Sequence, residues 1–252
     1  MIPVLQEVPT NEASASDFDW EQRLPNSWYA RRGHRWLDRL LLCLLLPPAL
    51  PLMALISLIN LAAFREVRRI FFVQPRIGWR GQPFQMFKFR TMAQPRSSEM
   101  GSWESGEDVL RVTTFGRFLR NTHLDELPQL FNILRGEMSF IGPRPEMVEV
   151  EDWALESIPR FSERLAIRPG VAGLAQVTQG YTGRDTKAYA RKLAINLEYI
   201  ERMSLAFDLE IVLRTIVWML RGKGWEWKPV HVDEPTVPKT VAPTVGLRRR
   251  AG

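Results

Sequence analysis

The stretch THLDELPQLFNILRGEMSFIGPRP, residues 122–145, decides how the centre of this chain folds. Pro128 lacks an amide proton and is tolerated in a helix only in the first turn, so the apolar residues after it predict a helix that begins close to Leu127. Asp125 and Glu126 then stand at the N-terminus of this helix. Unpaired amides and the helix dipole stabilise negative charge there, and the same amides can hold a phosphate group.

A stiff turn closes the same stretch. Pro143 and Pro145 fix the backbone on both sides of Arg144, so one guanidinium is presented for bidentate contact with a phosphate. An N-capped amphipathic helix with acids in its first turn is also common in soluble proteins, and the Asp-Glu pair taken alone has that interpretation. The neighbouring apolar segment and the many nearby arginines favour a functional site instead.

Residues 40–64 form a run of 25 residues without a charge, which is long enough to cross a bilayer as a helix. Three prolines near its middle, at positions 47, 48 and 51, predict a kink or a break. Both flanks are rich in arginine, and basic residues mark the cytoplasmic side of a membrane. We therefore expect a helix-break-helix that enters one leaflet and returns. A proline-kinked transmembrane span with a basic periplasmic flank is the main alternative. A buried soluble hairpin is disfavoured, because the run has almost no polar residue to face water.

The composition agrees with a membrane partner. An excess of 34 Lys and Arg over 28 acids gives a net charge of +6, which suggests a polyanionic partner. Because the arginines cluster beside the apolar segment and not in a separate basic domain, we expect an anionic lipid surface and no nucleic acid. Cys43 is the single cysteine, so a disulfide framework is excluded, and three scattered histidines fit no zinc spacing. His123 is interpreted as a solvated or capping residue.

Other segments carry weaker patterns. Residues 84–90 alternate apolar and polar side chains, which predicts a half-buried strand with Lys88 and Arg90 on one face. A short helix is expected over residues 113–121, with Thr114 as its cap and Arg120 on it. Residues 93–109 lack periodicity and predict a mobile loop.

The second half of the chain is mostly helical in pattern. A helix broken or capped at Pro159 is expected over residues 147–165, followed by tight turns at Arg168 and a strand-like piece at 174–178. Residues 186–202 have a helical period. Residues 205–220 suit an amphipathic helix that lies on a membrane surface or packs on the apolar segment.

Three blocks, residues 75–92, 113–146 and 168–177, together resemble the successive signatures of the bacterial sugar transferases, the monotopic phosphoglycosyl transferases. The resemblance covers roughly residues 36–224 and is to the small form without an N-terminal multi-span domain. It implies an α/β, mostly helical fold: a membrane-embedded re-entrant helix-break-helix, then a compact cytoplasmic catalytic domain with amphipathic interfacial helices and a small sheet. The expected parts are a polar tail (1–33), the hairpin (34–69), the catalytic domain (70–224) and a disordered basic tail (225–252).

The resemblance also implies an activity. Members of the family transfer a sugar 1-phosphate from a nucleotide sugar, expected to be a UDP-sugar, to polyprenyl (undecaprenyl) phosphate at the cytoplasmic face of the bacterial inner membrane. This is the initiating step of exopolysaccharide, capsule, O-antigen or glycoprotein glycan synthesis. Asp125 would attack the phosphate that bears the sugar and form a covalent aspartyl phosphosugar, releasing a nucleotide monophosphate. Glu126 would hold Mg²⁺, which prefers one or two carboxylates plus substrate phosphates. The expected substrate-binding residues are Lys88, Arg90, Arg120, Arg144 and Arg168, together with Pro143 and Pro145.

Two other functions remain compatible with these residues. A membrane-anchored scaffold or regulator of a polysaccharide synthase would use the basic face and leave the acid pair structural. A membrane phosphoanhydride hydrolase would use the same acids and metal without an acceptor lipid. A homo-oligomer, the identity of the sugar and the nucleotide base are left open.

Overall fold

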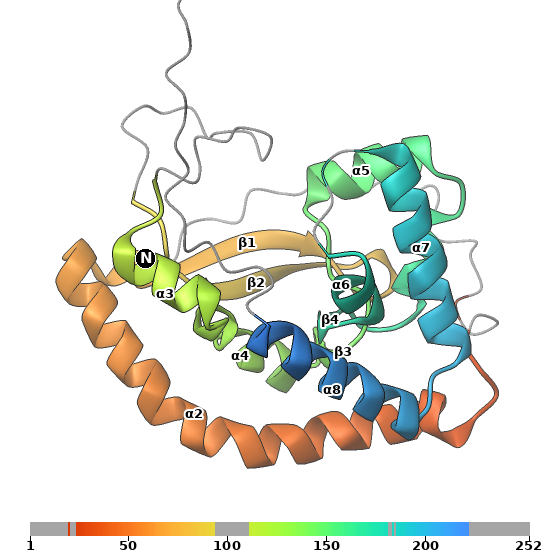
Figure 1. Ribbon diagram of the computed structural model, residues 1–252, viewed down its shortest axis with the longest axis horizontal. Helices are drawn as coiled ribbons and strands as arrows, with labels where there is room; N and C mark the ends of the chain where they lie inside the picture. The colour runs from red at the N-terminus through yellow and green to blue at the C-terminus, as the bar shows by residue number, and fades with distance from the viewer. Residues whose placement is uncertain (1–19, 21–23, 94–110, 181–182, 184, 222–252) are drawn as a thin grey trace, which may run out of the picture.

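The computed structural model describes residues 20, 24–93, 111–180, 183 and 185–221. The predicted C-terminal tail, most of the predicted N-terminal tail and nearly all of the predicted loop at 93–109 lie outside the described residues. Within the described part, one long helix curves around a mixed helical and stranded domain (Figure 1).

The long helix is α2, His34–Phe64, and a short π-helical segment, Tyr29–Gly33, precedes it. Its three prolines lie inside one continuous helix, so the expected break is absent from the secondary structure. The helix instead changes direction part-way along, with α4 and α8 on its concave side in this view (Figure 1). Proline removes a helical hydrogen bond and clashes with the preceding turn, which bends a helix that packing holds together.

One side of α2 packs against the domain and the other side is exposed. Leu42, Met53 and Ile56 join a core that includes Met86 and Phe89. Helical residues 29–64 are long and apolar enough to cross a membrane; the most apolar 18-residue window has a mean hydropathy of 2.3, and 17% of it is buried. The exposed large hydrophobic side chains on α2 are Trp36, Leu40, Leu44, Leu45, Leu50, Leu52, Leu55, Leu58 and Ile59.

Two small sheets follow. Strand β1, Phe71–Ile77, pairs antiparallel with β2, Pro83–Phe89, which confirms the strand expected from alternation at 84–90. Strands β3, Ser139–Ile141, and β4, Gly170–Ala172, pair in parallel. The strand expected at 174–178 is wrong: this segment is the short helix α6, Leu174–Thr178. Five residues are too few for a hydrophobic period to distinguish a strand from a helix. Strand β4 ends just before this segment.

The remaining helices match the patterns closely. The short helix α3, Thr114–Asn121, is capped by Thr113 and not by Thr114 as expected, since the Thr113 hydroxyl accepts a hydrogen bond from the Gly116 amide at 2.9 Å. The predicted break near Pro159 separates α5, Val148–Ser157, from the 3-10 segment Phe161–Ala166.

Two long helices complete the domain, and both were predicted. Helix α7, Thr186–Glu201, buries Tyr189, Leu193 and Asn196 on one face. Helix α8, Leu205–Leu220, buries Phe207, Asp208 and Ile211, and its opposite face exposes apolar side chains. The outward face of α8 is therefore mostly apolar, apart from the exposed Arg214–Glu210 ion pair, whereas a polar outward face was expected for an amphipathic helix.

The C-terminal half of α2 is fixed by a buried amide. The Asn60 side chain is 1% exposed, and its Nδ2 donates to the carbonyls of Ile70 at 3.0 Å and Arg90 at 3.1 Å. We expect Asn60→Leu, which keeps the volume and removes the donor, to lower the free energy of unfolding by about 1–3 kcal/mol because buried carbonyls lose a partner. Chemical unfolding in detergent micelles would measure it.

The matched control is Leu58→Ala on the exposed side of the same helix, where the change should stay within about 0.5 kcal/mol. Equal stability of the Asn60 variant and the parent would show that the amide does not anchor the helix.

Candidate active site

The acid pair lies in a tight turn directly before a helix. Leu124–Glu126 form a 3-10 segment, and α4, Gln129–Leu134, begins after Pro128, which confirms the predicted helix start to within two residues. His123 precedes the turn in the left-handed conformation, with φ +56°, and its carbonyl accepts a hydrogen bond from the Glu126 amide at 3.1 Å.

Glu126 is held between two cations. Its Oε1 accepts hydrogen bonds from Lys88 Nζ at 2.6 Å and from Arg144 Nη2 at 2.8 Å, and all three side chains are at most 17% exposed. Burial alone would raise the pKa of the Glu126 carboxyl, but the charges and hydrogen bonds of Arg144 and Lys88 outweigh it and hold the pKa well below its ordinary value. Glu126 is therefore a fixed anion.

Asp125 has a different environment although it is the next residue in sequence. Burial raises the pKa of its carboxyl, with Lys88 opposing the shift and the Glu126 charge reinforcing it. Its side chain makes no hydrogen bond within the described part of the chain. Two adjacent carboxylates thus differ, one being firmly paired and the other poorly compensated, and such a difference is typical of groups with separate chemical roles.

The Pro-Arg-Pro turn is fixed by arginines that the sequence patterns did not identify. Arg76 Nη1 donates to the Pro145 carbonyl at 3.1 Å, and Arg164 Nη1 donates to the Arg144 carbonyl at 3.2 Å. Arg164 is 1% exposed and forms a buried ion pair with Glu151. Pro143 accepts a hydrogen bond from the Gly170 amide at 2.9 Å. The turn is stiff, as predicted, but its rigidity also depends on these distant partners.

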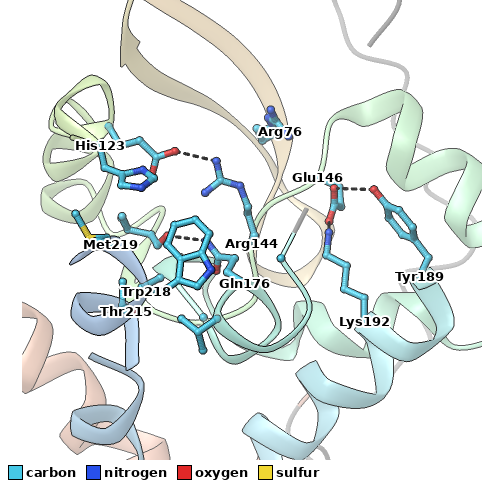
Figure 2. A pocket seen from close by; sticks show the side chains of 16 residues that line it. Arg76, His123, Arg144, Glu146, Gln176, Tyr189, Lys192, Thr215, Trp218 and Met219 are labelled. Atoms are coloured by element: carbon cyan, nitrogen blue, oxygen red, sulfur yellow. Dashed lines mark hydrogen bonds and ion pairs between the residues drawn. The ribbon is translucent and has the colours of Figure 1, made fainter. Parts of the chain in front are cut away.

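A pocket of about 280 Å³ opens beside this cluster, lined on one side by Glu126, Arg144 and Arg76. Figure 2 shows the Trp218 indole facing the pocket together with the His123 ring, and their centroids are 5.7 Å apart. His123 Nε2 is buried without a hydrogen-bond partner among the described residues, so the expected solvated role does not describe its position. His123 does stand at the N-cap position of the 3-10 segment, but its side chain makes no capping hydrogen bond.

The far wall of the pocket carries a second polar group that the sequence patterns missed. Lys192 forms an ion pair with Glu146, and the Tyr189 hydroxyl donates to Glu146 Oε2 at 3.5 Å (Figure 2). Burial raises the pKa of Glu146, but the positive charge of Lys192 outweighs it and the net shift is downward. Two features of the sequence could have pointed to this group: Glu146 directly follows the Pro-Arg-Pro turn, and Lys192 shares a helix face with Tyr189.

The other predicted substrate-binding residues are distributed unevenly. Arg120 donates from Nε to the Thr91 hydroxyl at 3.0 Å, and its charge acts to lower the pKa of Asp125, so it lies near the acid pair. Arg90 lies instead beside the end of α2, where the charges of Arg69 and Glu66 act on it.

Arg168 also lies away from the acid pair. Its Nε donates to the Gly136 carbonyl at 2.6 Å, and its guanidinium stacks over the Trp79 ring at 4.6 Å. The structure thus brings Lys88, Arg144 and Arg120 to the acids and places Arg90 and Arg168 at other surfaces.

The carboxylates of the acid pair could hold a metal ion such as Mg²⁺ only if further ligands complete its coordination. No group of three or more His, Cys, Asp or Glu side chains able to hold a metal occurs among the described residues. Glu126 Oε2 and the Asp125 carboxylate make no hydrogen bond with described residues, so two carboxylates remain available. Mg²⁺ characteristically takes one or two carboxylates and completes its shell with water and substrate phosphates.

The comparison with protein families agrees with this geometry. The sequence model of the bacterial sugar transferases matches residues 29–222, which include α2, both sheets and the acid pair. The chain belongs to the bacterial sugar transferase family. All residues of the acid cluster and its pocket lie inside the matched range.

Several curated relatives are similar to this bacterial sugar transferase. The UDP-glucose:undecaprenyl-phosphate glucose-1-phosphate transferase of Caulobacter vibrioides is 43% identical over 151 residues, which cover 59% of this chain and 56% of the relative. The UDP-N-acetylgalactosamine-undecaprenyl-phosphate N-acetylgalactosaminephosphotransferase of Aeromonas hydrophila is 36% identical over 203 residues, 80% of this chain and 46% of the relative. The exopolysaccharide production protein ExoY of Sinorhizobium fredii is 38% identical over 206 residues, 75% of this chain and 86% of the relative. The chain thus spans about half the length of the first two.

The cluster predicts a large stability effect at Glu126. In Glu126→Gln the cations Lys88 and Arg144 would stay buried without their anion, so we expect the free energy of unfolding at pH 7 to fall by roughly 3 kcal/mol or more. Because the folded-state pKa of Glu126 is depressed, its contribution is complete above about pH 4.5 and declines as the pH falls below that value. Chemical unfolding at several pH values would show the difference from the parent shrinking in acid.

Glu198→Gln is the matched control, since Glu198 also pairs with an arginine, Arg202, but is 49% exposed. Its effect should be below about 1 kcal/mol. A pH-independent loss in Glu126→Gln, or a loss no larger than in the control, would contradict the ion-pair interpretation.

Proposed function

We propose that this chain is a phosphoglycosyl transferase that moves a sugar 1-phosphate from a UDP-sugar to undecaprenyl phosphate. The relatives' names state such donors and this acceptor for those proteins. The observation that carries the proposal is the contrast within the acid pair: Glu126 is locked between Lys88 and Arg144, whereas Asp125 is buried and poorly compensated.

The proposed first step uses Asp125 as the nucleophile. One Asp125 carboxylate oxygen attacks the phosphorus that bears the sugar, the bond from this phosphorus to the bridging diphosphate oxygen breaks, and uridine monophosphate leaves with the electron pair. The product is an acyl phosphate between Asp125 and the sugar phosphate. An unpaired, partly desolvated carboxylate is a better nucleophile than one held by two cations, which favours Asp125 over Glu126.

Lys88 and Arg144 neutralise charge in this step. Both already point at Glu126 Oε1, so a phosphate that enters beside Glu126 meets donors that are in place. Glu126 and Asp125 are the residues that would hold Mg²⁺, which, when bound, supplies further neutralisation of the phosphate oxygens. Arg120 lies close enough to act on the charge of Asp125.

The second step returns the enzyme to its starting state. A phosphate oxygen of the acceptor lipid attacks the same phosphorus, the bond to Asp125 breaks, and the free carboxylate is regenerated. The product is a polyprenyl diphosphate sugar. The pocket beside Glu126, with Trp218 and His123 on one wall, is the proposed entrance for the donor.

The covalent step gives a direct test. Intact-protein mass spectrometry after mixing with a panel of UDP-sugars, without acceptor, should show a phosphosugar adduct on the parent that maps to Asp125. The Asp125→Asn variant should show no adduct and no turnover, because an amide does not form the acyl phosphate.

Glu126→Gln is the informative companion, since it should form the adduct slowly and recover part of its rate at high Mg²⁺. An active enzyme that never forms the adduct and needs both substrates bound together would refute the covalent route. Release of uridine monophosphate that never depends on undecaprenyl phosphate would indicate a hydrolase.

We also propose that α2 is re-entrant, with both ends on the cytoplasmic side of the inner membrane. Support comes from its exposed leucines, its bend, and the arginines at both flanks. Single cysteines at Asn26 and Val67 in a Cys43→Ser background should both resist an impermeant thiol reagent in intact cells and react after permeabilisation. Labelling of one of the two in intact cells would show a spanning helix instead.

A further inference from the structure

A second pocket, of about 360 Å³, lies at the junction of α2 and α4, away from the acid pair. It shares no lining residue with the pocket beside Glu126. Four arginines from three different parts of the chain surround it: Arg35 and Arg39 of α2, Arg135 at the C-terminal end of α4, and Arg168 just before β4.

These four arginines outnumber the acids around them. None of the four forms an ion pair within 4 Å with a carboxylate of the described residues. Among the described lining residues Asp38 is the one acid, and its Oδ1 already accepts from the Ser139 hydroxyl at 2.8 Å and the Phe140 amide at 3.0 Å. The pocket is therefore strongly positive.

Aromatic rings hold three of the guanidinium groups in position. Arg39 lies over Trp36 at 5.1 Å, Arg135 over Phe87 at 4.8 Å and Arg168 over Trp79 at 4.6 Å. Stacking occupies the face of a guanidinium and leaves the N–H groups at its edge for other partners. The Nε of Arg168 donates to the Gly136 carbonyl, so its two Nη groups are the donors that an anion would meet. Burial lowers the pKa of Arg168 and the charges of Arg35 and Arg39 lower it further, whereas the charge of Asp38 opposes the shift.

The rest of the pocket wall is mostly apolar. Leu42, Ile133, Leu134 and Met138 form it, and Leu134 is 59% exposed. The exposed leucines of α2 continue from this wall, and Trp36, which is 60% exposed, lies next to Arg39 at the point where the charged part of the helix ends. An aromatic residue beside arginines at such a boundary is typical of headgroup depth. The occupant should therefore be an amphiphile with an anionic head.

We propose that this pocket binds the phosphate headgroup of an anionic phospholipid, with an acyl chain along Leu42 and Leu134. The proposal rests on the proposed membrane placement of α2. The bound lipid is not the reacting acceptor, because eight residues of turn and helix lie between Glu126 and Arg135, which corresponds to roughly 10 Å or more. An acceptor phosphate must reach the phosphorus at Asp125, whereas this lipid fixes the depth of the domain on the membrane.

Native mass spectrometry of the full chain in detergent, titrated with phosphatidylglycerol, tests the proposal. The parent should retain one tightly bound phosphatidylglycerol, and Arg39→Gln with Arg135→Gln should weaken its binding about tenfold, because two cations near an anionic headgroup are lost. Both side chains are exposed, so the variant should fold. The control, Arg68→Gln with Arg221→Gln, removes two exposed cations outside the pocket and should change binding less than twofold.

Two further arms identify the source of the phosphate. Inorganic phosphate at the same concentration should not displace the lipid, and undecaprenyl phosphate should not compete for it stoichiometrically. Displacement by either would overturn the proposal, as would equal lipid retention in the pocket variant and the control. The single variant Arg39→Gln, with an intermediate loss expected, repeats the test should the double variant prove unstable.

Vesicle flotation with phosphatidylglycerol separates the two proposals. A parent chain that does not float with vesicles contradicts the membrane placement itself. A chain that floats, but whose pocket variant keeps the same bound lipid, contradicts the pocket alone.

Discussion

The Glu126 carboxylate, held between Lys88 and Arg144, is the interaction on which the arrangement of the site depends. Its partners come from strand β2 and from the Pro-Arg-Pro turn, 38 and 18 residues away in sequence. Each of the three charges is buried, and removing Glu126 would leave both cations without compensation in a medium of low dielectric constant. The ion pairs therefore fix the strand, the acid turn and the arginine turn relative to one another, while Asp125 remains unpaired and available.

A second group of charged residues holds the backbone of Arg144 in place. Arg164 donates to the carbonyl of Arg144 and pairs with Glu151, whose burial raises its pKa to about 6. Linked charges of this kind restrict the orientation of the Arg144 backbone more tightly than the two prolines could alone. Positioning of the guanidinium is thus a property of the fold and not only of the local sequence.

The sequence patterns correctly predicted the elements whose structure depends on residues close together in the chain. The period of α7 and α8, the alternation of β2 and the constraint of Pro128 on the acid turn all follow from neighbours in sequence, and all are present. The strand expected at 174–178 failed because five residues carry no decisive period. The Glu146–Lys192 pair was missed because its members are 46 residues apart and meet only in the folded chain. Arg168 was expected to bind substrate because it lies in a block that resembles the family. In the folded chain its guanidinium lies over the Trp79 ring, away from the acid pair.

The position of α2 follows from polar anchors more than from its leucines. Leucine packing tolerates sliding, because one apolar contact replaces another at small cost, whereas a buried polar group needs its own partner. Near the start of α2, Asp38 accepts hydrogen bonds from Ser139 and Phe140 of strand β3. Near its end, Asn60 donates to the carbonyls of Ile70 and Arg90. These two anchors bracket the apolar segment and hold it in one register against the domain. Any membrane that takes up the exposed face of α2 is thereby placed at a fixed distance from Asp125, which the proposed reaction between a soluble donor and a lipid phosphate would require.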